Sequence, residues 1–474
     1  SSPEFAVRAV FTYFHFLKLR NKLLMFTYWK TGLLRMCVRT LFVSAAIFFF
    51  ARPGPCSAAG DALQIDIYGP GQKSANLYVA PLFSEGEAVR GTGKKAVGYL
   101  KENLSFAPFL NQVNGTELVG GGEIAGFQAR DIDFKRLQLS RVDILITAVA
   151  REEKDALAGV AFRAFDVFSG RMLLGKGYTL TRKKQIPLAA RKFSADLVEK
   201  LAGSGGLYLA QIAFARKNKD GTKDICLTRV PGRDVRQITQ LSGISTSPSF
   251  SADGSRVVFS NMSQDRHRLG IWERNTDRAD LLEVPGTICI SPTIAPDGEI
   301  AASLNPRGNP DICYLSPDMN ISGFLVRNWA IDVSPAFDKS GGKMVFVSSR
   351  LGNPHIFILD LKTNNIKRVT YTGKYNTSPS ISPDGKLVVY SGRTESGHRI
   401  FINDLKSGMR RQLTFGPGND EEPSFGPNGH FIVFSSNRGG SYKLYLTTVN
   451  GARPRMIPTG PGEATTPDWC WKEV

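Results

Sequence analysis

Histidine and cysteine, the side chains most often used for metal binding and nucleophilic chemistry, are scarce in this sequence. The 474 residues include five His and six Cys. No two cysteines have the short spacing of a zinc knuckle. The chain also lacks the Gly-x-Ser-x-Gly elbow that carries the nucleophile of propeller-gated serine peptidases. We therefore expect no catalytic residue, no metal site and no cofactor.

The sequence has no basic run interleaved with aromatic residues, so we expect no nucleic-acid partner. The net charge is +18, and residues 1–60 account for +7 of it, with eight Lys and Arg against one acid. The remaining +11 predicts a solvated basic surface, and the alternative is contact with an anionic envelope surface.

The apolar run Thr40–Ala51 is too short to span a bilayer. It follows Met36, a candidate start, and precedes the small residues of Cys56–Ala59, a pattern typical of a cleaved secretory signal peptide. We therefore expect residues 1–59 to be a leader and the mature chain to be exported and soluble. The alternative is an uncleaved anchor that uses Phe11–Phe26.

A phrase of the form Ser-Pro-x-Phe, often followed by Asp-Gly or Asn-Gly, recurs through the second half of the chain. The steps between its prolines are 43 or 44 residues. A constant period of this size with several short strands per repeat is typical of a β-propeller. The prolines are Pro248, Pro292, Pro335, Pro379, Pro423 and Pro467.

Each repeat reads as four strands, and pairs such as Asp384-Gly385 are predicted to be hairpin turns rather than metal loops. Residues 207–241 supply a second, third and fourth strand but no first one. Thr465–Trp469 supplies a first strand with nothing after it. We therefore expect residues 207–474 to form a six-bladed propeller closed by the C-terminal strand, which removes free sheet edges.

The sequence of residues 60–203 predicts an α/β domain that has a mixed sheet and two main helices. Apolar runs at Leu77–Phe83 and Val142–Ala150 predict strands, and a helix is expected from Pro187 to a stop at Gly203.

The order of these parts resembles the TolB family, the periplasmic propeller proteins of the Tol–Pal envelope system. The resemblance rests on Lys200–Gly203 running into Gln211–Phe214 and then into the six repeats, and it covers residues 62–474. It implies a monomeric, non-enzymatic periplasmic scaffold. The propeller would hold the peptidoglycan-associated lipoprotein Pal, and thus the outer membrane, while an extended N-terminal segment would bind TolA. The pair of contacts would support envelope integrity and constriction at division.

The resemblance places Pal at the mouth of the central channel, at the loops just before each repeat proline. We expect a ring of polar groups there to receive a Pal loop and a basic side chain. Glu421 and Glu422 are adjacent acids with no obvious role in a turn. The alternative is that the ring only satisfies its own turns. The predicted contacts are Ser245, Thr246, Asp332, Asn376, Thr377, Asp420, Glu421, Glu422 and Thr465.

Leu63, Ile65 and Ile67 fall on one side of an extended segment. Such a segment suits addition to the sheet edge of a partner, here TolA. The alternative is an ordinary edge strand of the α/β domain.

The main enzymatic alternative is a metal-dependent polysaccharide lyase, because some of these enzymes use propeller histidines. His267, His355 and His398 occupy similar repeat positions between the second and third strands. Those loops lie far from the axis, so we expect solvated histidines rather than a shared ion. Cys226, Cys289, Cys313 and Cys470 are expected to be buried free thiols.

Overall fold

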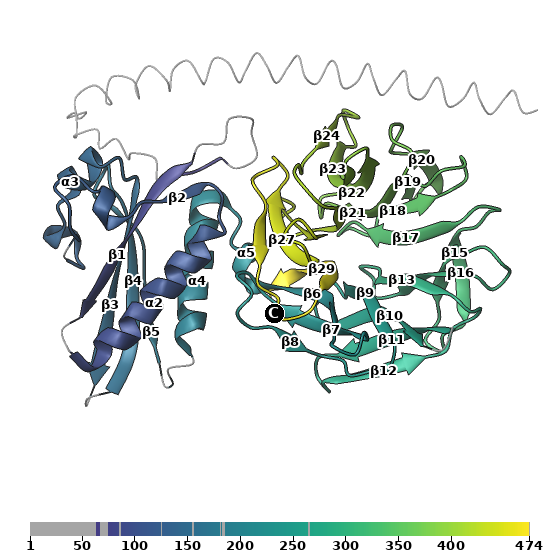
Figure 1. Cartoon of the computed structure of the whole chain (residues 1–474), viewed down its shortest axis with the longest axis horizontal. Helices are drawn as coiled ribbons and strands as arrows, with labels where there is room; N and C mark the ends of the chain where they lie inside the picture. The colour runs from purple at the N-terminus through teal and green to yellow at the C-terminus, as the bar shows by residue number, and fades with distance from the viewer. Residues whose placement is uncertain are drawn as a thin grey trace, which may run out of the picture. The chain divides into compact units, whose positions relative to one another are not determined.

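The computed structural model describes residues 63–66, 74–84, 87–124, 126–153, 156–180, 182, 185–263 and 266–473. An N-terminal α/β region precedes a C-terminal β-propeller region, which confirms these two predicted parts (Figure 1). The predicted leader with Met36, and Ile67 of the predicted TolA segment, lie outside the described residues. No helix in the described ranges is both long and apolar enough to cross a membrane.

The α/β region is a five-stranded mixed sheet with the strand order β2-β1-β3-β4-β5. β1 runs parallel to β2 and β3, whereas β4 is antiparallel to β3 and β5. Two long helices supply apolar side chains to the core on one face, and a short helix covers part of the other face. The elements are β1 (Ala75–Ser84), α2 (Glu87–Ser105), β2 (Leu110–Gln112), α3 (Phe134–Leu139), β3 (Ile144–Glu153), β4 (Ala156–Asp166), β5 (Met172–Thr179) and α4 (Ile186–Ala202).

Helix α4 begins and ends where the sequence predicts. Pro187 lies in its first turn, where a missing backbone N–H costs nothing. Phe193, Leu197 and Leu201 are fully buried, as fourfold spacing on one helix face requires. Gly203 ends the helix in the left-handed conformation with φ 61°. The short helix α5 (Gly206–Leu209) then leads into the first propeller strand.

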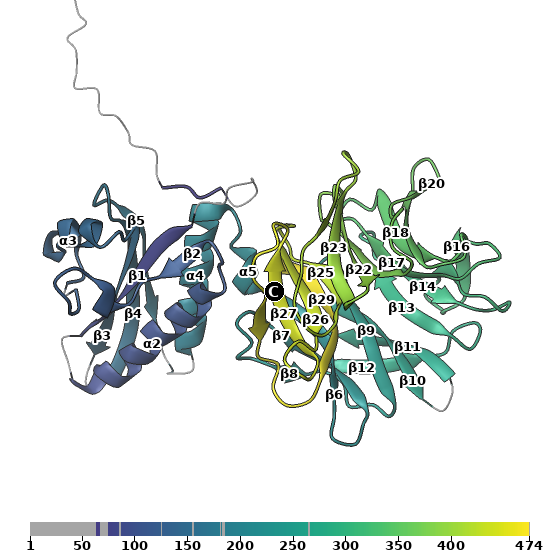
Figure 2. The ribbon, with the colours of Figure 1, turned by 45° about the horizontal axis from the view of Figure 1, so that its top comes forward.

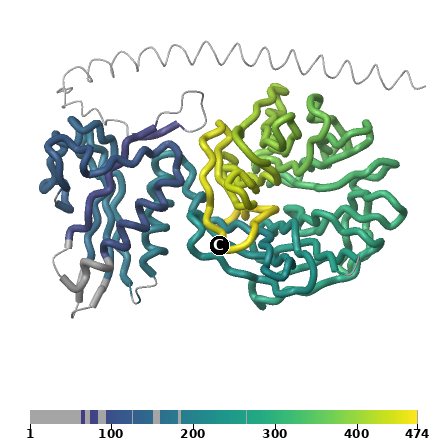
Figure 3. Tube along the Cα trace, viewed as in Figure 1, coloured from purple at the N-terminus to yellow at the C-terminus, as the bar shows by residue number. Residues whose placement is uncertain are grey.

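The propeller region contains four separate four-stranded antiparallel sheets. They lie in sequence order around the region, as the tube trace in Figure 3 shows. The first has β13 (Cys289–Ile294), β14 (Ile300–Leu304), β15 (Asp311–Leu315) and β16 (Ile321–Val326). The second has β17 (Asp332–Phe337), β18 (Lys343–Ser348), β19 (His355–Asp360) and β20 (Asn365–Arg368). The third has β21 (Asn376–Ile381), β22 (Leu387–Thr394), β23 (Gly397–Asp404) and β24 (Arg410–Gln412). The fourth has β25 (Asp420–Phe425), β26 (Phe431–Ser436), β27 (Lys443–Thr448) and β28 (Arg455–Ile457).

The prediction of six separate sheets is not met, because the remaining eight strands form one sheet. A parallel bridge between Lys223 and Ile244 joins β7 to β9 and so merges two groups of four strands. The C-terminal strand pairs antiparallel with β6. The strands are β6 (Ala210–Lys217), β7 (Lys223–Thr228), β8 (Arg236–Gln237), β9 (Ile244–Phe250), β10 (Arg256–Ser263), β11 (Arg266–Glu273), β12 (Arg278–Leu282) and β29 (Ala464–Glu473).

The residue before each repeat proline has the left-handed backbone conformation, with φ between 44° and 58°. A following proline disfavours the right-handed helical region for that residue. The pairing register shifts at the same place in each of these strands, so the left-handed residue and the proline form a bulge. The residues are Ser247, Ser291, Ser334, Ser378, Glu422 and Thr466.

Candidate partner-binding site

The six bulges surround one cavity of about 170 Å³. Each of the strands β9, β13, β17, β21, β25 and β29 contributes its left-handed residue, its proline and the residue after the proline. A second cavity of about 70 Å³ is lined by those last residues and by the apolar residues that follow them. The two cavities share one residue from each strand and therefore adjoin, and we call them together the channel. The shared residues are Ser249, Thr293, Ala336, Ser380, Ser424 and Asp468.

The shared side chains link one channel strand to the next. Ser380 Oγ accepts the Phe425 N–H at 3.2 Å, and Ser424 Oγ accepts the Trp469 N–H at 3.2 Å. Asp468 Oδ2 accepts the Phe250 N–H at 2.8 Å. The C-terminal strand β29 is thereby held between β25 and β9 at the narrow part of the channel.

Asp468 is the acid in this ring of small side chains. Its side chain lines the channel and is half-buried, and this burial raises its pKa to about 6. The Phe250 N–H and the Ser424 hydroxyl, 3.3 Å from Oδ1, partly offset that effect. The Asp468 carboxyl therefore stays protonated to a higher pH than an ordinary aspartate, although it is ionised near neutral pH.

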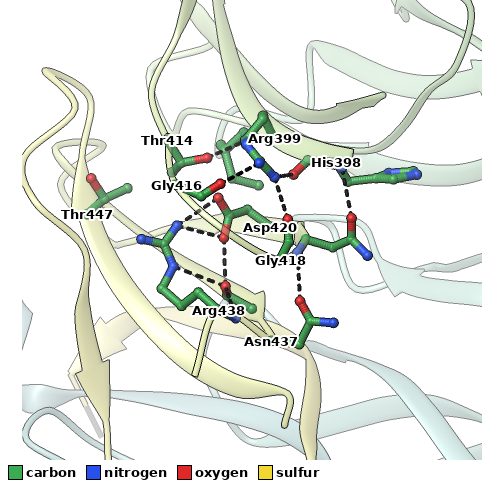
Figure 4. A network of polar contacts seen from close by, with 12 residues as sticks. His398, Arg399, Thr414, Gly416, Gly418, Asp420, Asn437, Arg438 and Thr447 are labelled. Carbon is green, nitrogen blue, oxygen red and sulfur yellow. Dashed lines mark hydrogen bonds and ion pairs between the residues drawn. The ribbon is translucent and has the colours of Figure 1, made fainter. Parts of the chain in front are cut away.

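Four of the predicted Pal contacts are fully buried and hold the loops of their own sheets. Ser245, Asp332, Asn376 and Asp420 have no exposed surface and occupy the same position, three residues before the proline. Asp420 receives two hydrogen bonds of 2.7 Å from Arg438 and one of 2.6 Å from the Ser436 hydroxyl (Figure 4). Their bonding is consistent with support of the loops rather than direct contact with a partner.

Of the three related positions, Asp332 repeats the aspartate–arginine pairing of Asp420, whereas Ser245 and Asn376 have neutral partners. Asp332 Oδ1 accepts a hydrogen bond of 3.1 Å from Arg350. Ser245 Oγ accepts one of 3.0 Å from the Asn261 side-chain amide. The Asn376 side-chain amide lies 3.2 Å from His355 Nδ1.

The other five predicted contacts are half-buried and lie beside the channel: Thr246, Thr377, Glu421, Glu422 and Thr465. Thr246 Oγ1 lies 3.3 Å from Thr466 Oγ1, and Thr465 Oγ1 accepts a hydrogen bond of 3.3 Å from Lys223. Strand alternation explains most of the division, because adjacent residues such as Asn376 and Thr377 face opposite ways. Glu422 departs from the alternation because it is the left-handed residue of its bulge. This period-two signal was available in the sequence and separates supporting residues from accessible ones.

Glu421 and Glu422 do have structural partners, so the interpretation that they lack a turn role is wrong. Glu422 Oε2 accepts the Thr466 N–H at 2.6 Å and the Ser435 hydroxyl at 2.9 Å. Burial raises the pKa of Glu422. Glu421 accepts a hydrogen bond from the Tyr442 hydroxyl. The two acids thus connect β25 to neighbouring strands while still bordering the channel.

The three repeat histidines are not solvated loop residues, in contrast to the prediction. They lie in or at the start of third strands, and each contacts the first strand of the next sheet. His267 Nδ1 lies 3.2 Å from the Cys289 carbonyl, and His398 Nδ1 lies 3.4 Å from Glu421. His355 is buried, which lowers its pKa, with a smaller contribution from Arg368. Within the described ranges, no three His, Cys, Asp or Glu side chains are grouped as a metal site.

The cysteine prediction is confirmed. Cys226, Cys289, Cys313 and Cys470 are buried free thiols, and burial raises the pKa of each to about 11 or 12.

Residues 63–66, the described part of the predicted TolA segment, pack on the α/β region and are not paired as a strand. Ile65 is 5% exposed, and its N–H donates to the Leu201 carbonyl at 2.7 Å. Leu63 is partly buried against the same core.

Comparison with known proteins finds one family model, two relatives and one solved structure that are similar to this chain. Residues 198–473 match the family model described as the TolB beta propeller domain. The Tol-Pal system protein TolB of Nitratidesulfovibrio vulgaris is 41% identical over 315 residues, which are 66% of this chain and 71% of that protein. The protein TolB homolog of Chlorobium luteolum is 32% identical over 272 residues, 56% of this chain and 60% of that relative, which is less than two thirds of its length. The crystal structure of TolB from Acinetobacter baumannii matches with a TM-score of 0.72 and 19% identity, over 86% of this chain and all of that one, and so shows a common fold.

Proposed function

Because this chain belongs to the TolB family, we propose that it links two partners of the Tol–Pal system in the periplasm. It is a non-enzymatic member of that system. In this proposal the propeller binds Pal at the channel mouth, and the N-terminal segment binds TolA. The chain is then peripheral to the outer membrane through Pal, and it supports envelope integrity and constriction at division.

We also propose that the eight-stranded sheet comprises two blades, β29-β6-β7-β8 and β9 to β12, so that residues 207–474 form six blades. The six equivalent bulges around one channel support this architecture. The two groups of four meet through the single pair Lys223–Ile244, whereas β10 and β11 alone share eight pairs. In this proposal β29 closes the propeller, and residues 60–203 form the separate α/β domain.

The channel mouth supports the Pal proposal best, because it offers a concave polar surface that the protein leaves accessible. Thr246, Thr377, Glu421, Glu422 and Thr465 would contact Pal, whereas the buried Ser245, Asp332, Asn376 and Asp420 would fix the loops that present them. A partner loop with a basic side chain would meet Glu421 and Glu422.

Thr377→Arg tests the Pal site. Thr377 is half-buried at the mouth, and no side-chain hydrogen bond is found for it in the described ranges. A long cationic side chain there obstructs the channel and should weaken binding of the Pal domain at least tenfold, with an unchanged melting temperature. Isothermal titration calorimetry measures the affinity. Thr276→Arg, in the exposed turn between β11 and β12 on the opposite side of the sheet, is the matched control. Wild-type affinity in Thr377→Arg would exclude the mouth as the docking site.

For the TolA proposal, the segment has to leave its position against Leu201, because Ile65 cannot be buried in two places. A synthetic peptide of residues 60–72 avoids this competition and should bind TolA. The same peptide with Ile65→Asp should not bind, because strand addition places alternate apolar side chains in pockets of the partner. Equal binding, or none, by the two peptides in fluorescence anisotropy would favour the ordinary structural role of the segment.

A further inference from the structure

Six large hydrophobic side chains are exposed in loops of the sheets β17–β20, β21–β24 and β25–β28. We call this group the apolar arc. The exposed fractions are 72% for Trp329, 47% for Ile331, 56% for Leu351, 73% for Tyr371, 41% for Tyr375 and 65% for Phe415. All six lie in segments that precede a first strand or join a second strand to a third, which is the side of the sheets that carries the mouth residues.

Contacts between successive loops connect the segments that carry the arc. The Ser349 N–H donates to the Ile331 carbonyl at 3.0 Å, which joins the Trp329 loop to the Leu351 loop. The Asn376 N–H donates to the Pro354 carbonyl at 3.0 Å, which joins the Leu351 loop to the segment that carries Tyr371 and Tyr375. The Tyr375 ring lies 6.0 Å from that of His398, whose N–H donates to Asn419 in the Phe415 loop.

The corresponding segments before β9, β13 and β29 differ. Residues 239–243, 283–288 and 458–463, all within the described ranges, include no exposed large hydrophobic side chain. They are rich in Gly, Pro, Ser and Thr instead. Met262 at the end of β10 is also exposed, at 39%. The apolar side chains are nevertheless concentrated on the three sheets β17–β20, β21–β24 and β25–β28, several of whose strands are labelled in Figure 2.

The size and composition of the arc fit one half of a protein interface. Six such side chains expose on the order of 500 Å² of apolar surface, at the upper end for a monomer. A standard interface covers about 800 Å² on each partner, and Trp and Tyr are over-represented among the residues that dominate its energy. Resting on the proposed function, we infer that the Pal-type partner sits off-centre over these three sheets and covers the apolar arc while its loop enters the mouth.

The charges around the arc indicate the surface of that partner. Arg327, Lys374 and Arg393 are exposed, and no ion pair is found for them in the described ranges. Glu395 is the acid in the same loops. The partner therefore presents an apolar patch bordered by carboxylates. An anionic membrane fits less well, because it cannot fill the polar channel and would face Glu421 and Glu422 beside it.

Trp329→Ser combined with Tyr371→Ser tests the inference in the full chain. Both side chains are about three-quarters exposed, so the melting temperature should not change. Affinity for the soluble Pal domain should fall at least 30-fold. The matched control is Leu139→Ser with Phe168→Ser, which removes two exposed apolar side chains from the α/β region. Lys374→Glu with Arg393→Glu should weaken binding at least fivefold and reduce its salt dependence.

The outcomes separate the inference from the function on which it rests. If the wild type binds Pal and Thr377→Arg weakens binding but the arc variant does not, the off-centre geometry is refuted and the mouth site stands. If the wild type does not bind Pal, the proposed function fails and the inference with it. Vesicles with anionic phospholipid are titrated in parallel. Vesicle binding that is lost in the arc variant while Pal affinity is unchanged would identify a membrane surface and overturn the inference.

Discussion

Deletion of residues 464–474 is expected to leave the propeller region unfolded or aggregated. The deletion removes β29, which pairs with β6 along its length and contributes the fully buried Trp469 and Cys470. Loss of one buried Trp side chain costs about 3–5 kcal/mol. A domain has a total stability of roughly 5–15 kcal/mol. Backbone hydrogen bonds along β6 are lost as well, and the exposed edge invites pairing with a second molecule.

Size-exclusion chromatography and the circular-dichroism melting curve measure this outcome. Deletion of residues 472–474 alone is the control, because it shortens the chain at the same end but keeps Asp468, Trp469 and Cys470. That variant should remain monomeric with a melting temperature close to that of the wild type. A monomeric, folded protein without residues 464–474 would contradict the proposed closure by β29.

The regular spacing of the repeat prolines was sufficient to predict the propeller and the position of its first strands. A period-two pattern and Asp-Gly turns specify short antiparallel strands locally, so the strand order within each repeat follows from the sequence. The bridge between Lys223 and Ile244 was not predictable, because it depends on how close two neighbouring sheets come in space. The left-handed residues were missed for a related reason, since a Ser-Pro pair is compatible with an extended backbone as well.

The candidate site was predicted as a ring but not residue by residue. Treating each pre-proline loop as uniformly accessible ignored the alternation that buries Asp420 and leaves Glu421 beside the channel. The Glu422 carboxylate bonds to Ser435 in the next strand, β26, and also to Thr466 in β29, which is 44 residues away in sequence. The apolar arc gave no periodic signal at all, because its side chains come from separate loops of three repeats.

Asp468→Asn is expected to make the protein more stable than the wild type at neutral pH. Burial raises the pKa of Asp468 to about 6, above the ordinary aspartate value of 3.8, so the folded chain binds this proton more tightly than the unfolded chain. Its contribution to stability is therefore greatest below the unfolded pKa and is lost as the pH rises from about 4 through about 6. Ionised Asp468 then costs roughly 2–3 kcal/mol at pH 7.5, by the conversion of 1.36 kcal/mol per pKa unit.

Asparagine suits the position because its carbonyl can accept the Phe250 N–H and its amide can donate to Ser424, while it carries no charge. Urea unfolding of the two proteins should show a difference of roughly 2–3 kcal/mol at pH 7.5 that shrinks towards zero near pH 4. Asp253→Asn is the control, because its effect on stability at neutral pH should have the opposite sign: this substitution should destabilise the protein. Hydrogen bonds from Ser251 and Ser255 lower the pKa of Asp253 to about 2, so its contribution is present above pH 4 and is lost as the pH falls. If Asp468→Asn is instead less stable than the wild type at pH 7.5, the ionised carboxylate is needed to hold β29 against β9, and the channel favours charge at this position.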